Sequence, residues 1–231
     1  MSFFTESLLA ACRLILHCDS ELLKIIQVSL SVSGLATFAA AVLGIPAGFF
    51  LAYARFTGKR VLITILNTLL ALPTVVIGLF VYTFISRRGI FGHLDLLYSQ
   101  TAMIIGQFIL ILPLITALTI SAISRIDERY RRTAMTLGAN SWQTALVVAR
   151  EGRFALSAAV ISAFGRVISE IGISMMLGGN IKGFTRTMTT AMALEYDKGS
   201  FTLAIALGII LMLLSLSINI LFNLIQGQTG R

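Results

Sequence analysis

Long runs of apolar residues alternate with short polar segments along almost the whole chain. Each run approaches or exceeds the roughly 20 residues that an α-helix needs to cross the hydrocarbon core of a bilayer. The pattern therefore predicts an all-α integral membrane protein with five transmembrane helices, the first of which is long enough to begin in the membrane interface. The predicted crossings cover about 22–53, 61–85, 102–123, 154–177 and 201–225.

The first 20 residues carry a shorter apolar pattern, and Glu6 interrupts it. This segment is too short and too mixed for a crossing, so we expect an amphipathic helix at the membrane surface.

Prolines lie in each of the first three crossings, at Pro46, Pro73 and Pro113. Proline removes a backbone donor and favours a kink, and in lipid the freed carbonyl needs a partner. Ordinary helix bending and a moving, substrate-lined bundle both fit this pattern.

The composition agrees with a membrane protein and bears on whether its positive charge indicates a nucleic-acid partner. Of the 231 residues, 57% are hydrophobic and 12% are charged, which is about half the charged fraction of a soluble domain. A net charge of +8 would suggest nucleic acid in a soluble protein, but in a membrane protein basic residues near the crossings mainly record orientation. We therefore expect a lipid environment and no nucleic-acid partner.

The basic residues divide unevenly between the two ends of the predicted crossings. More of them share a side with the loop at about 125–153 than lie on the opposite side. Cytoplasmic loops carry the excess of Lys and Arg, so this loop is predicted to be cytoplasmic. With five crossings, the N-terminus is then outside and the C-terminus in the cytoplasm, as expected of a multi-pass membrane protein.

The 125–153 loop has the signals of two short helices joined by a turn. Asp127 can cap the first helix, Gly138 suits the left-handed residue that ends it, and Ser141 can cap a second helix that starts at Trp142. Three interpretations fit an arginine-rich helix pair between two crossings: a loop on anionic lipid, a DNA-binding element, or an element that docks into a groove of a soluble partner. Apolar and small residues recur at helical spacing at Tyr130, Ala134 and Leu137, and at Trp142, Ala145, Leu146 and Ala149.

The stretch RTAMTLGANSWQTALVVARE resembles the EAA loop of ABC importer permeases, which those proteins insert into their ATPase subunits. Arg132-Thr133-Ala134 stands where the family has E-A-A, Gly138 is the glycine, and Val148 is the later apolar position. The Glu and the first Ala are replaced, and Arg150-Glu151 stands in place of a common Leu-Pro. The resemblance implies that the ATPase contacts this segment. The residues implied are Arg132, Thr133, Ala134, Leu137, Gly138, Ala139 and Trp142.

Three further segments resemble the permeases of oxyanion importers, of the tungstate type and its molybdate and sulfate relatives. They lie at 67–92, 164–172 and 176–195, and the resemblance covers about 25–226. It implies the type I ABC importer permease fold, as one transmembrane domain over 1–231. The implied partners are a cytoplasmic ABC ATPase, a second copy of the chain and an extracytoplasmic solute-binding protein.

The chain lacks the G-x-x-x-x-G-K-[ST] loop that cradles nucleotide phosphates. No catalytic Ser/His/Asp set, metal-ligand cluster or carboxylate pair stands out either. We therefore expect a non-catalytic subunit without a cofactor of its own, with ATP and Mg²⁺ bound by the partner ATPase.

Ionisable and polar residues near the fourth crossing are candidates for the translocation pathway. Arg166 and Glu170 lie one helical turn apart, and charges at that depth usually face protein or water. They fit a structural ion pair, a gate that meets the passing anion, or both. The segment GGNIKGFTRTMTTA then offers flexible glycines, hydroxyls and positive charge, and fits either a gate-and-docking loop or a plain external loop. The candidates are Arg166, Glu170, Gly172, Gly179, Asn180, Thr185 and Arg186.

Two other classes of function compete with an importer permease. A stand-alone anion channel or secondary transporter would need internal coupling-ion sites or an inverted repeat, and neither is evident. A membrane enzyme acting on lipid would need a carboxylate or histidine cluster at the interface. Tungstate, molybdate and sulfate share charge and geometry, so the sequence leaves the choice of cargo open.

Overall fold

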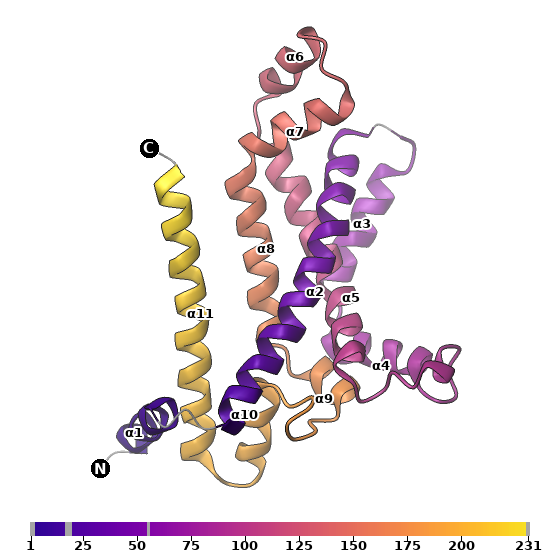
Figure 1. Ribbon diagram of the computed structural model, residues 1–231. Helices are drawn as coiled ribbons and strands as arrows, with labels where there is room; N and C mark the ends of the chain where they lie inside the picture. Colours follow the sequence, from indigo (N-terminus) through magenta and orange to yellow (C-terminus); the bar gives the residue numbers. More distant parts are fainter. Residues whose placement is uncertain (1–2, 17–19, 55, 230–231) are drawn as a thin grey trace.

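The computed structural model describes residues 3–16, 20–54 and 56–229, and within these residues it is helical with no β-strand. Figure 1 shows the helices as a bundle with a helical hairpin at one end. The helices are α1 Phe3–Leu16, α2 Ser20–Tyr53, α3 Lys59–Leu70, α4 Thr74–Ile85, a 3-10 turn η1 Gly92–Leu94, α5 Gln100–Ser124, α6 Glu128–Thr136, α7 Ser141–Glu151, α8 Arg153–Ile168, α9 Gly172–Gly178, α10 Met188–Asp197 and α11 Phe201–Thr229.

Three of these helices, α2, α5 and α11, are long and apolar enough to cross a membrane without a break. Two further candidate crossings are bent pairs, α3 with α4 at 100° and α8 with α9 at 60°. Up to five crossings therefore exist within the described residues, when each bent pair counts as one. The fold class expected from the sequence is confirmed, and the predicted crossings at 61–85 and 154–177 correspond to the two bent pairs.

The break in the second crossing has a local cause. Pro73 has no backbone N–H to donate and restrains the residue before it to extended conformations. Helix α3 therefore ends at Leu70, and Pro73 becomes the residue that precedes α4. Pro46 and Pro113, by contrast, lie inside the continuous helices α2 and α5.

Small residues allow α2 and α5 to pack closely along the centre of the bundle. Ala36, Ala40, Gly44 and Gly48 recur every four residues on α2, and all are buried. In a membrane, small residues at this spacing let helix backbones approach. A Cβ atom added to Gly48 would lie 2.5 Å from Cβ of Thr119 on α5, so this position tolerates no side chain.

Replacing Gly48 with leucine is expected to destabilise the protein strongly. Overpacking of this kind typically costs about 1–3 kcal/mol or more. The melting temperature of the detergent-purified protein should fall by several degrees, and less folded protein should accumulate. Gly34→Leu is the matched control on the same helix, because a Cβ there has no atom within 4 Å. Equal melting temperatures for the two variants would contradict the packing described here.

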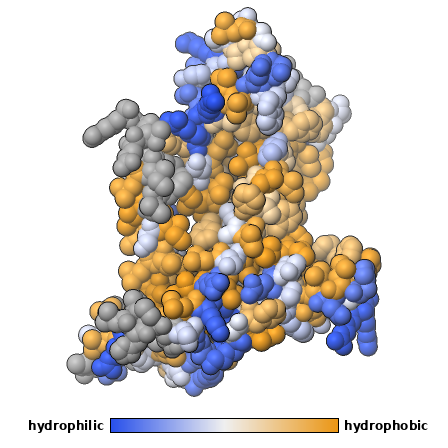
Figure 2. All heavy atoms as spheres, viewed as in Figure 1, coloured by the Kyte–Doolittle hydropathy of each residue, from blue (hydrophilic) through white to orange (hydrophobic). Residues whose placement is uncertain are grey.

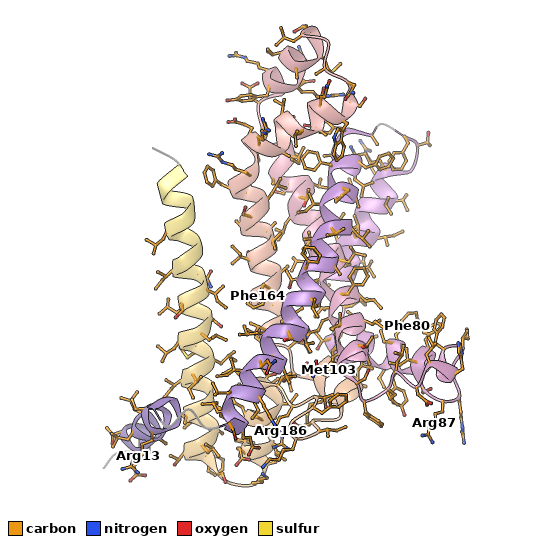
Figure 3. All side chains as sticks on the ribbon, in the orientation of Figure 1. Arg13, Phe80, Arg87, Met103, Phe164 and Arg186 are labelled. Carbon is orange, nitrogen blue, oxygen red and sulfur yellow. The ribbon has the colours of Figure 1, made fainter. Side chains whose placement is uncertain are left out.

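The polar parts of the molecule gather at its two ends, with an apolar belt between them (Figure 2). The α6–α7 pair and the end of α11 share one end in Figure 1, while α1, α9, α10 and the tip near Arg87 share the other. Arg13, Arg87 and Arg186 all lie at this second end, spread across its width (Figure 3). The two-sided division of basic residues expected from the sequence is therefore present in the fold.

Helix α1 packs against the last crossing, α11. It is viewed nearly along its axis in Figure 1, across the end of α11 opposite the helical hairpin. Leu8 and Leu9 are exposed on it. The expected N-terminal helix is therefore present from Phe3 to Leu16, and residues 1–2 and 17–19 of the expected segment lie outside the described residues.

Candidate functional site

The first helix of the hairpin, α6, begins and ends with the residues expected from the sequence. The Asp127 side chain accepts a hydrogen bond from the backbone N–H of Arg129 at 2.9 Å. Gly138 follows the helix with φ +84°, a left-handed conformation that L side chains rarely adopt. Arg132 points away from the turn and pairs with Glu128 at 2.7 Å, so it stabilises the exposed side of α6.

The second helix, α7, begins one residue earlier than expected. Asn140, not Ser141, is its N-cap: the Asn140 side chain accepts the backbone N–H of Gln143 at 2.8 Å. The Gln143 side chain accepts the backbone N–H of Asn140 at 2.9 Å in return. This reciprocal capping box satisfies two donors at once.

The inner side of the hairpin is fixed to the ends of three crossings. Val148 on α7 is only 1% exposed and belongs to a buried cluster with Ile123 of α5 and Leu156 of α8. Phe49 and Tyr53, at the end of α2, pack against the same cluster. A push on the hairpin is therefore transmitted to α2, α5 and α8 through close-packed side chains.

A second contact ties α6 to the end of α2. The guanidinium of Arg131 lies 4.7 Å from the centroid of the Tyr53 ring, a cation–π geometry.

A further contact lies within the hairpin. A hydrogen bond to the Glu151 carboxylate raises the pKa of Tyr130 above its usual range. The phenol donates to the Glu151 carboxylate, which joins α6 to the end of α7.

The outer side of the hairpin exposes large apolar residues. Leu137 is 83% exposed and Trp142 is 77% exposed, and they flank the Gly138 turn. Tyr130, Ala134 and Leu137 were expected to share one face, but only Ala134 is buried. Leu137 is exposed because α6 already ends at Thr136. A groove of about 500 Å³ adjoins Leu137, and Tyr130, Thr133, Ala134 and Val147 help to line it. Exposed apolar groups beside a groove are typical of a protein interaction surface.

Replacing Gly138 with alanine should weaken this surface without filling any space. A Cβ at Gly138 meets no atom within 4 Å, so the penalty comes only from the positive φ and is about 1–2 kcal/mol. We expect the hairpin turn to shift and the melting temperature of the purified protein to fall by a few degrees. Gly34→Ala is the control, since it is also free of contacts but is helical. A Gly138→Ala protein that melts like Gly34→Ala would contradict a fixed turn.

Arg166 and Glu170 form the ion pair that the sequence suggests, but not within one helix. Arg166 Nη1 lies 3.4 Å from Glu170 Oε2, although α8 ends at Ile168. The Glu170 carboxylate is only 4% exposed, and its Oε1 accepts the backbone N–H of Gly172 at 2.9 Å and that of Ile173 at 3.4 Å. Glu170 therefore accepts the first two backbone N–H groups of α9 and stabilises the 60° bend between α8 and α9.

Arg166, by contrast, is 48% exposed and lies on an unusual face of α8. The exposed positions along that face are small or polar, whereas the exposed face of α2 carries Leu35, Phe38 and Val42. Large apolar side chains suit lipid, and small or polar ones suit water or another helix. The face of α8 consists of Ala155, Ala158, Ser162, Gly165, Arg166 and Ser169.

The segment between α9 and α10 is a tightly hydrogen-bonded loop. Gly179, Asn180 and Gly183 adopt positive φ angles. The buried Thr185 hydroxyl accepts the backbone N–H of Ile181 at 3.0 Å and donates to the carbonyl of Gly178. Asn180, Thr185 and Arg186 are therefore brought together as one unit.

A buried hydroxyl links this loop region to the bend at Glu170. Thr189 donates to the Glu170 backbone carbonyl at 3.0 Å, which joins α10 to the α8–α9 break. Glu21, at the start of α2, pairs with Lys182 and Arg186, and the sequence analysis missed it. Its only signal was its place as the carboxylate nearest the start of the first crossing.

The sequence was compared with protein families and with known proteins. The profile of the family described as binding-protein-dependent transport system inner membrane component matches residues 44–230. The tungstate uptake system permease protein TupB of Peptoclostridium acidaminophilum is 39% identical over 228 residues, which cover 99% of this chain and 100% of that protein. TupB of Campylobacter jejuni is 35% identical and covers 89% of this chain and 86% of its own length.

More distant relatives are described as sulfate and molybdenum transport permeases, at 24% and 28% identity. Among solved structures, a chain of a bacterial ABC transporter involved in the import of the acidic polysaccharide alginate superposes with a TM-score of 0.77. That match covers 92% of this chain and 81% of the other at 16% identity, so it establishes a shared fold.

Proposed function

Because the chain belongs to the family of binding-protein-dependent transport system inner membrane components, we propose that it is the tungstate-conducting membrane subunit of an ATP-driven importer. A permease of this family is a multi-pass protein of the inner membrane and works with an ATPase and a solute-binding protein. The observation that carries the proposal for this chain is its hairpin, which is exposed and apolar on one side and anchored to three crossings on the other.

In the proposed assembly the hairpin inserts into a groove of the ATPase subunit. Leu137, Thr133 and Ala134 adjoin one groove on the hairpin, and Trp142 stands exposed beside the turn. Gly138 and Ala139 form the turn itself, and Arg132 lies on the solvent side. ATP and Mg²⁺ bind to the ATPase, and this chain contributes no catalytic residue. ATP-driven closure of the ATPase moves the hairpin, and the cluster around Val148 passes this movement to the crossings.

Two copies of the chain enclose the pathway in this proposal. Helix α3 has no buried residue, and Asn67 lies exposed along it among residues of a candidate crossing. A polar amide facing lipid is costly, so a second copy or a water-filled pathway suits this face. The polar face of α8 that carries Arg166 likewise suits contact with a second copy or with water rather than with lipid. The hairpin faces the cytoplasm, so the N-terminus is outside and the C-terminus inside.

The translocation pathway runs past Arg166, which presents positive charge from the half-exposed face of α8. A dianion stripped of water is expensive in hydrocarbon, so rocking of the two copies around a wet cavity avoids full desolvation. Glu170 and Gly172 hold the bend beside Arg166, and Gly179, Asn180, Thr185 and Arg186 form the loop at the outer mouth. This arrangement admits the anion alternately from either side.

Uptake of ¹⁸⁵W-labelled tungstate by cells that express the chain with its ATPase and binding protein tests the proposal. We expect saturable uptake that excess unlabelled tungstate abolishes and that equal concentrations of sulfate inhibit weakly. Cells that carry all components except this chain are the control. Stronger inhibition by molybdate or sulfate than by tungstate would reassign the cargo, and uptake by the chain without the ATPase would favour a channel or secondary transporter.

A further inference from the structure

The Glu21 carboxylate is held between two cations of the loop that joins α9 to α10. Lys182 Nζ lies 2.7 Å from Oε2 of Glu21, and Arg186 Nη1 lies 3.3 Å from Oε1. Each carboxylate oxygen therefore faces its own cation. Figure 3 shows Arg186 at the lower end of the bundle, near the start of α2.

The position of the arginine does not depend on Glu21 alone. Arg186 is only 16% exposed, its Nε donates to Oδ1 of Asn180 at 3.2 Å, and its Nη2 donates to the carbonyl of Asn180 at 3.5 Å. The backbone N–H groups of Phe184, Thr185 and Arg186 all donate to the carbonyl of Ile181. The loop therefore presents a fixed guanidinium, and removal of the carboxylate would leave a mostly buried positive charge in need of an anion.

The ion pair lines a cavity that opens at this end of the molecule. Its volume is about 350 Å³, against roughly 30 Å³ for one water in the liquid, so a small hydrated oxyanion fits. Its charged lining residues include more cations than carboxylates. They are Glu21, Lys182, Arg186, Glu195 and Lys198.

We propose that Lys182 and Arg186 form an outer binding site for a divalent tetrahedral oxyanion, and that Glu21 fills this site when no anion is present. The inference rests on the proposed function. A tetrahedral dianion offers two oxygens to the same two donors with twice the charge of a carboxylate, which strengthens both contacts. Glu21 competes because it is tethered, and its effective concentration is in the range of millimolar or above. An anion released nearby by a binding protein can displace it, whereas dilute free anion cannot.

Displacement of Glu21 also has a mechanical consequence. Glu21 lies in the first turn of α2, and Tyr53, the last residue of α2, packs beside the hairpin. Arrival of the anion therefore breaks an ion pair at one end of the helix whose other end contacts the hairpin. The outer site is in this way linked to the ATPase side of the molecule through a single continuous helix.

Equilibrium dialysis of ¹⁸⁵W-labelled tungstate against the purified full-length chain tests the site. We expect Glu21→Gln to bind tungstate at least tenfold more tightly than the wild type, because the competing carboxylate is gone. The double variant Glu21→Gln/Lys182→Met should lose this gain. Asp95→Asn is the matched control: it removes a carboxylate from an exposed arginine pair at the same end, and it should bind like the wild type.

Melting temperatures measured on the same samples separate a misfolded variant from an informative one. If Glu21→Gln is folded and binds no more tungstate than the wild type, the outer site is wrong and the ion pair is only structural. The same conclusion follows if Lys182→Met leaves the gain intact. Tungstate uptake by the wild-type transporter is measured in parallel: its absence contradicts the proposed function, whereas normal uptake with an unresponsive Glu21→Gln contradicts only the outer site.

Discussion

Replacing both Leu137 and Trp142 with aspartate is expected to abolish ATP-driven uptake while leaving the membrane bundle folded. Both side chains are more than three-quarters exposed, so the chain itself loses little packing. Burying a large apolar side chain in a partner contributes about 1.5–3 kcal/mol, and such anchors dominate an interface. Losing two of them should weaken binding of the ATPase on the order of a thousandfold.

Co-purification of the ATPase with the tagged chain and the initial rate of uptake are the two measurements. Leu94→Asp is the control, because Leu94 is also exposed but lies in the tip at the opposite end of the molecule. It should retain the ATPase. If the double variant still co-purifies with the ATPase and transports at the wild-type rate, the hairpin is not the docking element.

Glu170→Ala is expected to destabilise the protein and to stop transport. The substitution leaves the partly buried N–H of Gly172 and the buried N–H of Ile173 without their acceptor, and a buried donor left unpaired costs about 1–3 kcal/mol. Loss of the ion pair with Arg166 should add little to the loss of stability, because the Arg166 side chain is half exposed and solvent screens the pair. The melting temperature should fall by roughly 5–10 °C for a chain of this size.

Two neighbouring variants separate the roles of this carboxylate. Glu170→Gln keeps a side-chain oxygen for the two N–H groups, so it should retain most of the stability. Ser169→Ala removes only a hydroxyl that bonds within its own helical turn, and it should melt like the wild type. A Glu170→Ala protein as stable as Ser169→Ala would contradict the assignment of Glu170 to the start of α9.

The sequence predicted the crossings and the hairpin because both depend on local patterns. Apolar runs reveal membrane helices wherever they lie in the bundle, and Asp127 and Gly138 act on their own helix ends. The cap of α7 was misplaced by one residue, because Asn140 and Ser141 are both good caps and the reciprocal contact with Gln143 decides between them.

Features that depend on tertiary contacts were not predictable in the same way. Pro73 indicated a kink but not its 100° angle, which depends on how α4 packs on α9 and α5. Glu170 was expected on a continuous helix, yet its carboxylate caps the next one. Glu21 and Arg186 are 165 residues apart, so no local pattern could join them. The burial of Val148 and the exposure of Leu137 likewise follow from the way the hairpin docks on the bundle.

The hairpin's coupling role is tested by the initial rate of tungstate uptake into proteoliposomes that contain this chain with or without the ATPase subunit, with the binding protein in the external medium and ATP inside. We expect uptake only when the ATPase and ATP are both present, and none when the hairpin carries Leu137→Asp/Trp142→Asp. Uptake at a comparable rate by the chain alone, or by the double variant, would contradict that role.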